Sequence, residues 1–275
     1  MNQWSLSSMT ENFIAYDKVV FFDDFIGNEL DRTKWNVEIT GEIYNKEQQA
    51  YIDSEKTIYF LPEYESSQGV LVIHPRYHKG FETTQKQKLD FLSGRINTRS
   101  KFEFQEGCVS ARIKVPRGEG LWPAFWALGS SGKWPGCGEI DIMEYVGESD
   151  WTCASVHGPG YSGEAGLTNR KFMPAENDAT HWHVYSMIFT KDLILFEIDG
   201  ETIYRVTRPM VEFFGEWVFD NQKFLILNFA LGGVFPYKTN GINSPYYGIP
   251  QATVEAIQRD EIKLLVDWVK VTITK

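Results

Sequence analysis

The sequence predicts an all-β protein, with a sandwich or a barrel as the two architectures that its pattern allows. Short runs of Val, Ile, Phe, Tyr, Trp and Thr are bounded by Gly, Pro, Asn and Asp, which is typical of strands joined by turns. Several runs alternate apolar and polar residues, as a half-buried strand requires, and no longer window shows a helical stripe. The chain has 275 residues without a visible linker or repeat, so we expect one domain.

The strand patterns recur along the whole chain after an N-terminal extension at residues 1–17. The clearest hairpin is LILFEIDGETIYRV, in which Asp199 and Gly200 supply the two positive-φ residues of a tight turn. Short helical turns are expected at 208–217 and 253–262, and the polar residues 78–90 are expected to form a long surface loop. The expected strands lie near 18–25, 57–62, 69–75, 92–104, 107–116, 121–128, 138–146, 151–157, 182–190, 193–206, 223–231 and 264–274.

The composition narrows the possible partners. Lys and Arg total 27 against 37 Asp and Glu, and this net charge of −10 disfavours binding to nucleic acid or to an anionic membrane. No stretch approaches the roughly 20 apolar residues that span a bilayer. We therefore expect a protein that binds neither nucleic acid nor membranes. We also expect it to be a monomer. Aromatic residues make up 15% of the chain, which favours a ligand with flat apolar faces.

The cysteines and the N-terminus bear on the cellular compartment. Cys108, Cys137 and Cys153 are odd in number, so they are either buried thiols or one disulfide with one free thiol. The first residues, MNQWSLSSMTENF, lack the basic start and apolar run of a secretion signal. The chain is therefore either intracellular or a domain of a longer protein.

One strand carries an unusual set of acids. The segment WPGCGEIDIMEYVG places Glu139, Asp141 and Glu144 among apolar residues. In a regular strand Glu139 and Asp141 share a face while Glu144 points to the other side. A β-bulge at Ile142-Met143 would return Glu144 to the face of the other two acids.

With that bulge, the spacing suits a glycosidase. The Cα atoms of Glu139 and Glu144 would be roughly 13 Å apart, and side chains leaning toward each other would leave the carboxyl separation of about 5 Å typical of retaining enzymes. Asp141 would tune the pair, because crowded carboxyls cannot all ionise. Two alternatives stay open: a solvated polar face without a role, and a Ca²⁺ or Mg²⁺ site, although acids on one strand seldom wrap around an ion.

These residues resemble family 16 of the glycoside hydrolases, in its laminarinase-like branch. The likeness includes the E-x-D-x-x-E spacing and the segments SGRINTRSKFEFQEGCVSARIKVPRGEGLWPAFWALG, SVHGPGYS, LILNFALGG and VDWVKV, and it covers residues 20–272. It implies a β-jelly-roll sandwich of two antiparallel sheets with a concave substrate cleft, forming one catalytic domain. It also implies that Glu139 is the nucleophile, Glu144 the acid/base and Asp141 a helper that holds a proton.

The resemblance further implies a set of sugar contacts. Trp122 and Trp126 are four residues apart and share a strand face, which is either the cleft or the core. A lone histidine such as His157 is equally compatible with a structural role. Phe235 follows LGG, where many relatives carry a tryptophan over the cleft. The full set of expected substrate-binding residues is Asn45, Glu47, Gln49, Arg95, Trp122, Trp126, Trp134, His157, Asn228 and Phe235.

A structural calcium ion is the one cofactor that the resemblance implies. Asp24, in FFDDF, occupies a place where a glutamate is common, and Asp267 lies in the last strand. Together they would bind Ca²⁺ on the convex face. The alternative is a pair of solvated carboxylates at a sheet edge.

The expected activity is endo-hydrolysis of β-1,3 links in laminarin-type and mixed-linkage β-glucans, with retention of configuration. Agarase- or galactanase-type hydrolases and transglycosylases of the same family are the main alternative. A glucan-recognition protein is the other, but such relatives have lost one or more catalytic acids, and all three are present here. The resemblance implies that the full-length protein is secreted.

Overall fold

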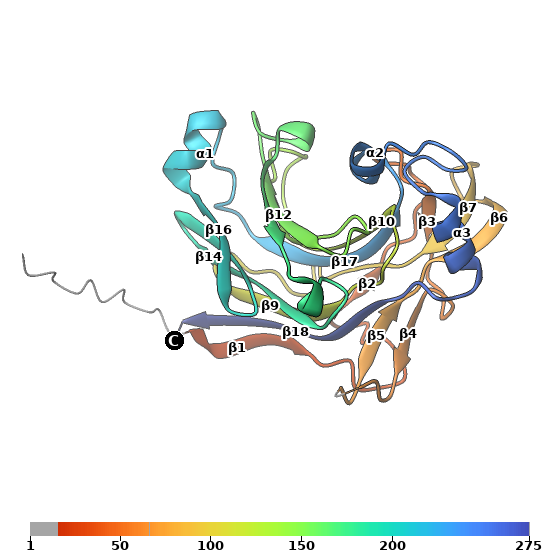
Figure 1. Cartoon of the computed structure of the whole chain (residues 1–275). Coiled ribbons are helices and arrows are strands. Elements are labelled where there is room, and N and C mark those ends of the chain that lie inside the picture. The colour runs from red at the N-terminus through yellow and green to blue at the C-terminus, as the bar shows by residue number, and fades with distance from the viewer. Residues whose placement is uncertain (1–15, 66, 275) are drawn as a thin grey trace, which may run out of the picture.

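The computed structural model describes residues 16–65 and 67–274, and within them most strands belong to two antiparallel sheets that pack face to face. Figure 1 shows the two layers, with β9, β14 and β18 in one and β10, β12 and β17 in the other. The predicted all-β class is confirmed, and the open choice between sandwich and barrel is settled as a sandwich. The expected extension at 1–17 lies mostly outside the described residues, and β1 begins at Tyr16.

The first sheet forms the convex layer. Its strand order in the described residues is β16-β15-β14-β9-β18-β5-β4, and β1 also pairs with β18. These strands are β1 (Tyr16–Asp23), β4 (Ile58–Leu61), β5 (Val70–Ile73), β9 (Gly107–Lys114), β14 (His183–Thr190), β15 (Leu193–Ile198), β16 (Glu201–Thr207) and β18 (Leu264–Thr274).

The second sheet carries the acids. Its order in the described residues is β13-β12-β11-β10-β17-β8-β2. These strands are β2 (Asn36–Val37), β8 (Arg95–Asn97), β10 (Leu121–Gly129), β11 (Glu139–Glu144), β12 (Trp151–His157), β13 (Leu167–Phe172) and β17 (Lys223–Leu231). The expected strand at 92–104 is shorter than predicted, because the chain turns after Asn97.

Residues 78–90 correct the sequence-based expectation. They are not a loop: β6 (Arg76–Glu82) and β7 (Lys88–Ser93) form a hairpin, and β3 (Gln49–Tyr51) pairs with β7 in parallel. The pattern was missed because β6 is an edge strand whose residues are largely exposed and polar, so it carries little apolar alternation.

Short helices stand at the rim. Figure 1 shows α1 (Arg208–Phe214) and α2 (Val234–Asn240) on the side of the second sheet that faces away from the first. The predicted turns at 208–217 and 253–262 correspond to α1 and to α3 (Gln251–Gln258), whereas α2 was not predicted. The 3₁₀ turns η1 (Gly163–Ala165) and η2 (Ala175–Asn177) complete the short elements of the described chain.

The predicted hairpin between β15 and β16 is confirmed. Asp199 has φ 53° and Gly200 has φ 81°, so both turn residues adopt the left-handed conformation. This conformation matches the right-handed twist of the two arms, and a glycine adopts it without the strain that a Cβ would add.

Alternation along β10 explains how one sheet serves both a core and a site. Leu121, Phe125 and Ala127 are fully buried between the sheets, whereas Trp122 and Trp126 are half-buried on the opposite face. A buried Leu or Phe side chain contributes roughly 1.5–3 kcal/mol of hydrophobic stabilisation. The residues that hold β10 in the sandwich therefore also fix which tryptophans face outward.

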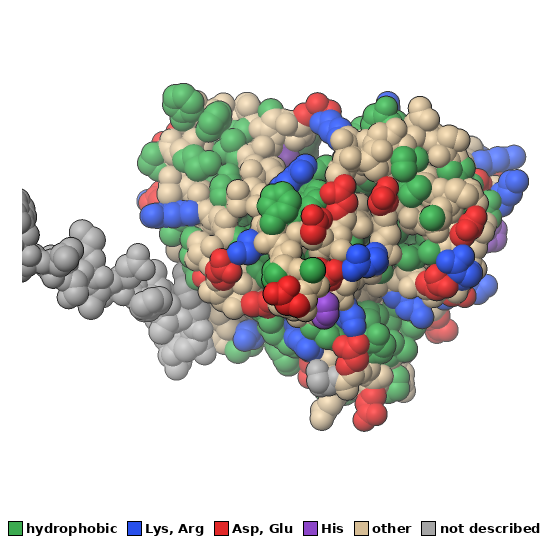
Figure 2. All heavy atoms as spheres, viewed as in Figure 1, with side chains coloured by type: hydrophobic (Ala, Val, Ile, Leu, Met, Phe, Trp, Pro, Cys, Tyr) green, Lys and Arg blue, Asp and Glu red, His purple; other side chains and the backbone are tan. Residues whose placement is uncertain are grey.

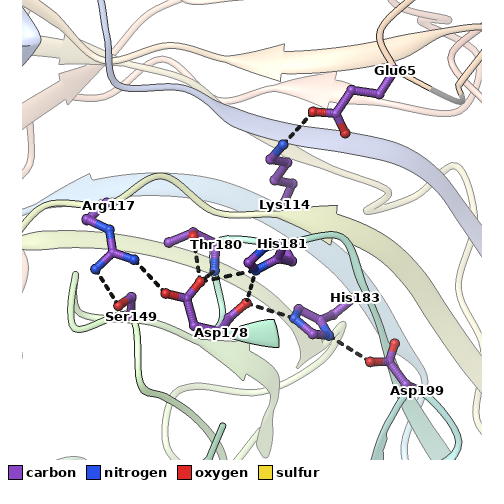
Figure 3. Close-up of polar contacts among 9 residues, drawn as sticks. All are labelled: Glu65, Lys114, Arg117, Ser149, Asp178, Thr180, His181, His183 and Asp199. Atoms are coloured by element: carbon purple, nitrogen blue, oxygen red, sulfur yellow. Dashed lines mark hydrogen bonds and ion pairs between the residues drawn. The ribbon is translucent and has the colours of Figure 1, made fainter. Parts of the chain in front are cut away.

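A polar network ties the segment before β12 to the sheet edge (Figure 3). Arg117 donates to Ser149 Oγ over 2.7 Å and to Asp178 Oδ2 over 2.5 Å. Buried His183 places Nε2 2.9 Å from the Asp178 carbonyl and Nδ1 2.7 Å from the Asp199 carboxylate. The turn of the β15–β16 hairpin and the segment that leads into β12 are thus fixed through the same aspartate.

Two further expectations concern cysteines and membranes. Cys137 and Cys153 are buried thiols and Cys108 is partly buried, and all three are free. Across residues 16–65 and 67–274, no helix has the length and apolar character needed to cross a bilayer. Figure 2 shows acidic and basic side chains interspersed over the face drawn.

Candidate active site

The predicted β-bulge on β11 is present. Asp141 pairs with Ser155 and Glu144 with Cys153, so β11 advances three residues while β12 advances two. Against β10, Asp141 pairs with Trp126 and Glu144 with Ala124, which are two residues apart and share a face. The bulge therefore brings Glu144 to the same face as Asp141, and this is the face directed away from the core.

The three acids Glu139, Asp141 and Glu144 form a row along β11, and Glu139 lies at its start. The indole N–H of Trp134 donates to Glu139 Oε2 over 2.8 Å, and the Asp141 side chain hydrogen-bonds to the same glutamate. Trp134 is 51% exposed, so its ring is open to solvent beside the carboxyl group. Glu139 thus has an indole donor from the rim on one side and a second carboxyl group from its own strand on the other.

Glu144 lies at the other end of the row and is 9% exposed. Trp122 Nε1 donates to Oε1 over 3.1 Å. Ser155 Oγ lies 3.2 Å and Cys153 Sγ 3.9 Å from Oε2. The two carboxyl oxygens therefore have different partners, an indole on one and a hydroxyl with a thiol on the other.

Burial and crowding raise the pKa values of these three carboxyl groups above their ordinary range. Burial, followed by the Asp141 charge, raises the pKa of Glu139 to about 8. Burial and the Glu144 charge raise the pKa of Asp141 well above its usual value, and burial raises the pKa of Glu144. Because Asp141 is the most enclosed, we expect it to keep a proton. That removes the Asp141 charge from beside Glu139, which then ionises more readily.

His157 lies against Asp141. Its Nε2 is 3.2 Å from Asp141 Oδ2, and the residue pairs with Glu139 across the strands. A Cβ at Gly166 would lie 2.2 Å from His157 Cε1, so this close approach requires glycine. The structure therefore places His157 beside the middle acid. One ligand atom each from Glu139, Asp141 and His157 lie within 4.8 Å of one another, a spacing that also suits a metal ion.

A second group of expected residues lies on β8, β10 and β17. Trp126 Nε1 donates to Asn228 Oδ1 over 2.7 Å, and Asn228 Nδ2 donates to the hydroxyl of Tyr51 over 3.0 Å. The Arg95 guanidinium lies 5.0 Å from the Trp126 ring centre and pairs with Glu38. Arg95, Trp126 and Asn228 are thus brought together on the face that carries the acids.

The loop NKEQQAY is anchored next to this group. Gln49 donates to Glu47 Oε2 over 2.8 Å, and its Oε1 accepts the N–H of Leu231 at the end of β17 over 2.8 Å. Burial raises the pKa of Glu47, with Gln49 and Arg95 opposing the rise. Asn45 is exposed and hydrogen-bonds to Glu47.

Phe235 lies on α2, which begins next to this loop, because the N–H of Val234 donates to the Asn45 carbonyl over 2.7 Å. Its ring meets that of Trp122 edge-on at 5.6 Å and lies 6.3 Å from that of Trp151. The Arg170 guanidinium stacks over Trp151 at 4.1 Å. Phe235 therefore packs into an aromatic wall beside Glu144. Figure 2 shows a notch between the parts of the rim that carry α1 and α2 in Figure 1.

Several residues of this face were missed from the sequence. Tyr51 lies in β3 and Arg170 in β13, two short strands that the pattern did not predict. Cys153 and Ser155 lie in a predicted strand, but their contact with Glu144 depends on the register that the bulge creates. The alternation of polar residues along β12 was the one sequence signal that could have placed Cys153 and Ser155 on the same face as the acids.

The expected calcium ligands are half-buried. Asp267 Oδ2 lies 2.6 Å from the guanidinium of Arg112, and Asp24 Oδ1 accepts the N–H of Ile26 over 3.4 Å. A cation already occupies one oxygen of Asp267, so a calcium ion would have to use the other oxygen together with backbone carbonyls. Calcium binding stays a prediction.

Comparison with known proteins places this geometry in a family. The family model "Glycosyl hydrolases family 16" matches residues 64–222. Glucan endo-1,3-beta-glucosidase A1 of Niallia circulans is 31% identical over 84% of this chain, and the chain spans 36% of that relative's length. Beta-glucanase of Rhodothermus marinus is 30% identical over 79% of this chain and 77% of its own length.

A solved structure agrees over nearly the whole chain. The endo-beta-1,3-glucanase from Pyrococcus furiosus superposes with a TM-score of 0.80 at 35% identity, covering 94% of this chain and 95% of its own. The fold, the bulged acid row and the sequence similarity therefore lead to one assignment. This chain belongs to family 16 of the glycosyl hydrolases.

Proposed function

We propose that the protein is an endo-acting glycoside hydrolase that cleaves β-1,3 links in laminarin-type and mixed-linkage β-glucans with retention of configuration. One observation carries the proposal. The bulge on β11 places Glu139, Asp141 and Glu144 on one outward face, between two groups of aromatic and polar side chains. Relatives described as endo-1,3-glucanases share the fold at more than 30% identity.

In the first step, Glu139 attacks the anomeric carbon of the sugar on the donor side. Glu144 gives its proton to the glycosidic oxygen, so the carbon–oxygen bond breaks and the acceptor sugar leaves as an alcohol. A covalent ester joins the donor sugar to Glu139. The proton on Asp141 keeps negative charge away from Glu139 before attack.

In the second step, Glu144 is ionised and takes a proton from water. The water oxygen attacks the same carbon, the ester to Glu139 breaks, and the sugar is released with its original configuration. Glu144 must therefore alternate between a protonated and an ionised form within each turnover. Burial raises the pKa of Glu144, which favours its protonated form before the first step.

The side chains around the acids suit a neutral sugar chain. Trp122, Trp126 and Trp134 offer ring faces for the apolar C–H surfaces of glucose units, while Arg95 and Asn228 offer groups that bond to hydroxyls. A sulfated polymer such as carrageenan favours a basic cleft, and the net charge of −10 opposes that alternative. A pure binding protein does not need three intact acids.

The experiment is a digestion panel of laminarin, curdlan, lichenan, agarose, κ-carrageenan and cellulose, with product sizing and linkage analysis. We expect mixed oligosaccharides from laminarin and curdlan, slower attack on lichenan, and intact cellulose. The bulge bends the strand under the substrate, and a curved floor suits the helical β-1,3 chain better than the flat β-1,4 chain. Untouched laminarin with degraded lichenan, agarose or carrageenan would refute the assignment.

We further propose that the full-length protein acts outside the cell, because polymeric glucans do not cross membranes. We also propose that it acts as a monomer. Its β-glucan substrate is the partner that the site supports. Cell fractionation with an antibody tests the location, and sedimentation of the purified chain tests the oligomeric state. Activity confined to the cytoplasm, or a stable dimer at working concentration, would refute the respective statement.

A further inference from the structure

We propose that Ser155 and Thr168 form a hydroxyl relay that serves Glu144 in both of its protonation states, as positioning residues for the reaction. The inference rests on the proposed role of Glu144 as acid/base. Ser155 lies on β12 and Thr168 on β13, and the two pair across these strands. Both belong to the outward face that carries the acids.

The contacts form a continuous chain away from the carboxyl group. Ser155 Oγ lies 3.2 Å from Glu144 Oε2 and 2.9 Å from Thr168 Oγ1. Thr168 Oγ1 lies 3.5 Å from the carbonyl oxygen of Gly166. Ser155 is 1% exposed, so its hydroxyl is held among protein partners, whereas Thr168 is an exposed residue of β13. This chain of hydrogen bonds ends on the carbonyl oxygen of Gly166, which can only accept.

Each hydroxyl can both donate and accept, so the hydrogen bonds that join Glu144, Ser155 and Thr168 can run in either of two directions. When Glu144 is ionised, Thr168 donates to Ser155 and Ser155 donates to the carboxylate. When Glu144 is protonated, its O–H donates to Ser155, Ser155 donates to Thr168, and Thr168 donates to Gly166. The two hydrogen bonds of Ser155 reverse direction without movement of a heavy atom, while Thr168 donates to Ser155 in one state and to Gly166 in the other.

The other neighbours of Glu144 cannot reverse in this way. Trp122 Nε1 only donates, and it donates to the opposite oxygen, Oε1. Cys153, at 3.9 Å, is a weak donor and acceptor. The charged or titratable groups that face Glu144 are Asp141 and Glu139 on β11, Cys153 and His157 on β12, and Arg170 on β13, which pairs with Cys153.

The relay predicts shifts of opposite sign in two variants. Ser155→Ala removes a donor to the ionised form, and a hydrogen bond to a charged group is the stronger kind, so the pKa of Glu144 rises. Thr168→Val leaves Ser155 able to donate to the carboxylate, but it removes the acceptor that Ser155 needs when Glu144 is protonated. The pKa of Glu144 then falls. A merely structural role for either hydroxyl predicts no such opposition.

The experiment measures the pH profile of kcat/KM on laminarin, in which the basic limb reports loss of the proton from Glu144. We expect Ser155→Ala to move this limb upward by about one pH unit and Thr168→Val to move it downward by less. Thr168→Ser keeps the hydroxyl and should restore the wild-type profile. Thr152→Val is the matched control, because Thr152 is a buried hydroxyl on β12 that does not contact Glu144.

Thermal melting of each variant establishes that it is folded before its profile is interpreted. An unchanged basic limb in Ser155→Ala, or limbs that move in the same direction in both variants, would overturn the relay. A shift in Ser155→Ala alone would reduce Ser155 to a simple donor and would also overturn it. Failure of the proposed function is distinguishable, because the wild-type protein would then not cleave laminarin at all.

Discussion

At the scale of single residues, the site depends on acids whose proton affinities are set by burial. Glu139 and Glu144 have similar chemistry but different neighbours, an exposed indole on one and a buried hydroxyl on the other. Asp141, between them, is the most enclosed of the three. The assignment of roles to these residues can be tested one side chain at a time.

Removal of either glutamate should stop turnover while substrate binding survives, because binding is spread along the aromatic face. We expect Glu139→Ala and Glu144→Ala each to lower kcat by several orders of magnitude. Azide should then rescue Glu139→Ala with an α-glycosyl azide as product, and Glu144→Ala with a β-glycosyl azide from an activated substrate. Glu106→Gln, an exposed acid directly before strand β9 of the other sheet, is the control. The reverse pattern of azide products would exchange the two roles.

Trp134 should tune the nucleophile through its N–H group. Trp134→Phe keeps an aromatic ring but removes the donor to Glu139 Oε2. A donor stabilises the ionised form, so its loss raises the pKa of Glu139. The acidic limb of the kcat/KM profile, which requires ionised Glu139, should therefore move to higher pH. Trp268→Phe, on the convex sheet, should leave the limb in place. If the acidic limb of Trp134→Phe does not move, the hydrogen bond from Trp134 has no part in setting the pKa of Glu139.

The sequence predicted the acid row but not everything around it. Glu139, Asp141 and Glu144 stand out because carboxylates are rare in an apolar strand, and the bulge follows from the need to place them on one face. Tyr51 and Arg170 gave no such signal, because each reaches the site from a strand whose position depends on pairing between distant segments. Contacts made through register are not visible in local patterns.

At the scale of elements, polar networks hold the segments that frame the site. Asp178 connects Arg117, Thr180 and His183 from different parts of the chain (Figure 3). Burial raises the pKa of Asp178, but hydrogen bonds from Thr180 and Ser149 and the charge of Arg117 outweigh that effect and lower it to about 2. The ionised form of this aspartate is therefore favoured by folding.

This shift predicts a pH dependence of stability. The pKa is lower in the folded state than the ordinary value of 3.8, so the contribution is complete above that value and is lost as the pH falls toward about 2. Asp178→Asn should reduce the free energy of unfolding at pH 6 by about 1–2 kcal/mol and by less near pH 2.5. Urea unfolding at both pH values measures the difference, with Glu106→Gln as the control. An equal loss at both pH values would show that the charge of Asp178 is not the cause.

The calcium prediction also belongs to this scale, because Asp24 directly follows β1, whose last residue Asp23 pairs with Val269 of β18, two residues after Asp267. A bound ion would stabilise the folded state by mass action without touching the chemistry. We expect the melting temperature to fall on addition of a chelator and to recover with Ca²⁺. Asp267→Asn should abolish the difference. An unchanged melting curve, with no metal by elemental analysis, would leave Asp267 as the partner of Arg112 alone.

Among elements, the long alternating strands and the Asp199-Gly200 hairpin were predicted correctly, because local pattern and final structure agree there. The edge hairpin at 76–93 and the short strand β13 were missed for one reason. Both β6 and β13 are edge strands whose residues are partly or fully exposed, so their pairing is decided by the neighbouring strand and not by an apolar pattern of their own.

At the scale of the whole molecule, the two sheets have different roles in the core and in the site. The convex sheet and the inner face of the second sheet build the core, and the outer face of the second sheet is left for the site. The high aromatic content serves both purposes, with rings such as Phe125 and Phe229 buried in the core and Trp122 and Trp126 on the outward face. One alternating strand pattern therefore encodes stability and substrate binding together.

The central claim is that hydrolysis proceeds in two steps through Glu139, with Glu144 as acid and then as base. Proton NMR of the reducing end during the first minutes of laminarin digestion tests it most directly, because the anomer released first records how many times the anomeric carbon was inverted. Two displacements predict that the β anomer forms first and then mutarotates. Initial release of the α anomer would mean a single displacement by water and would contradict the assignment of Glu139 as a nucleophile.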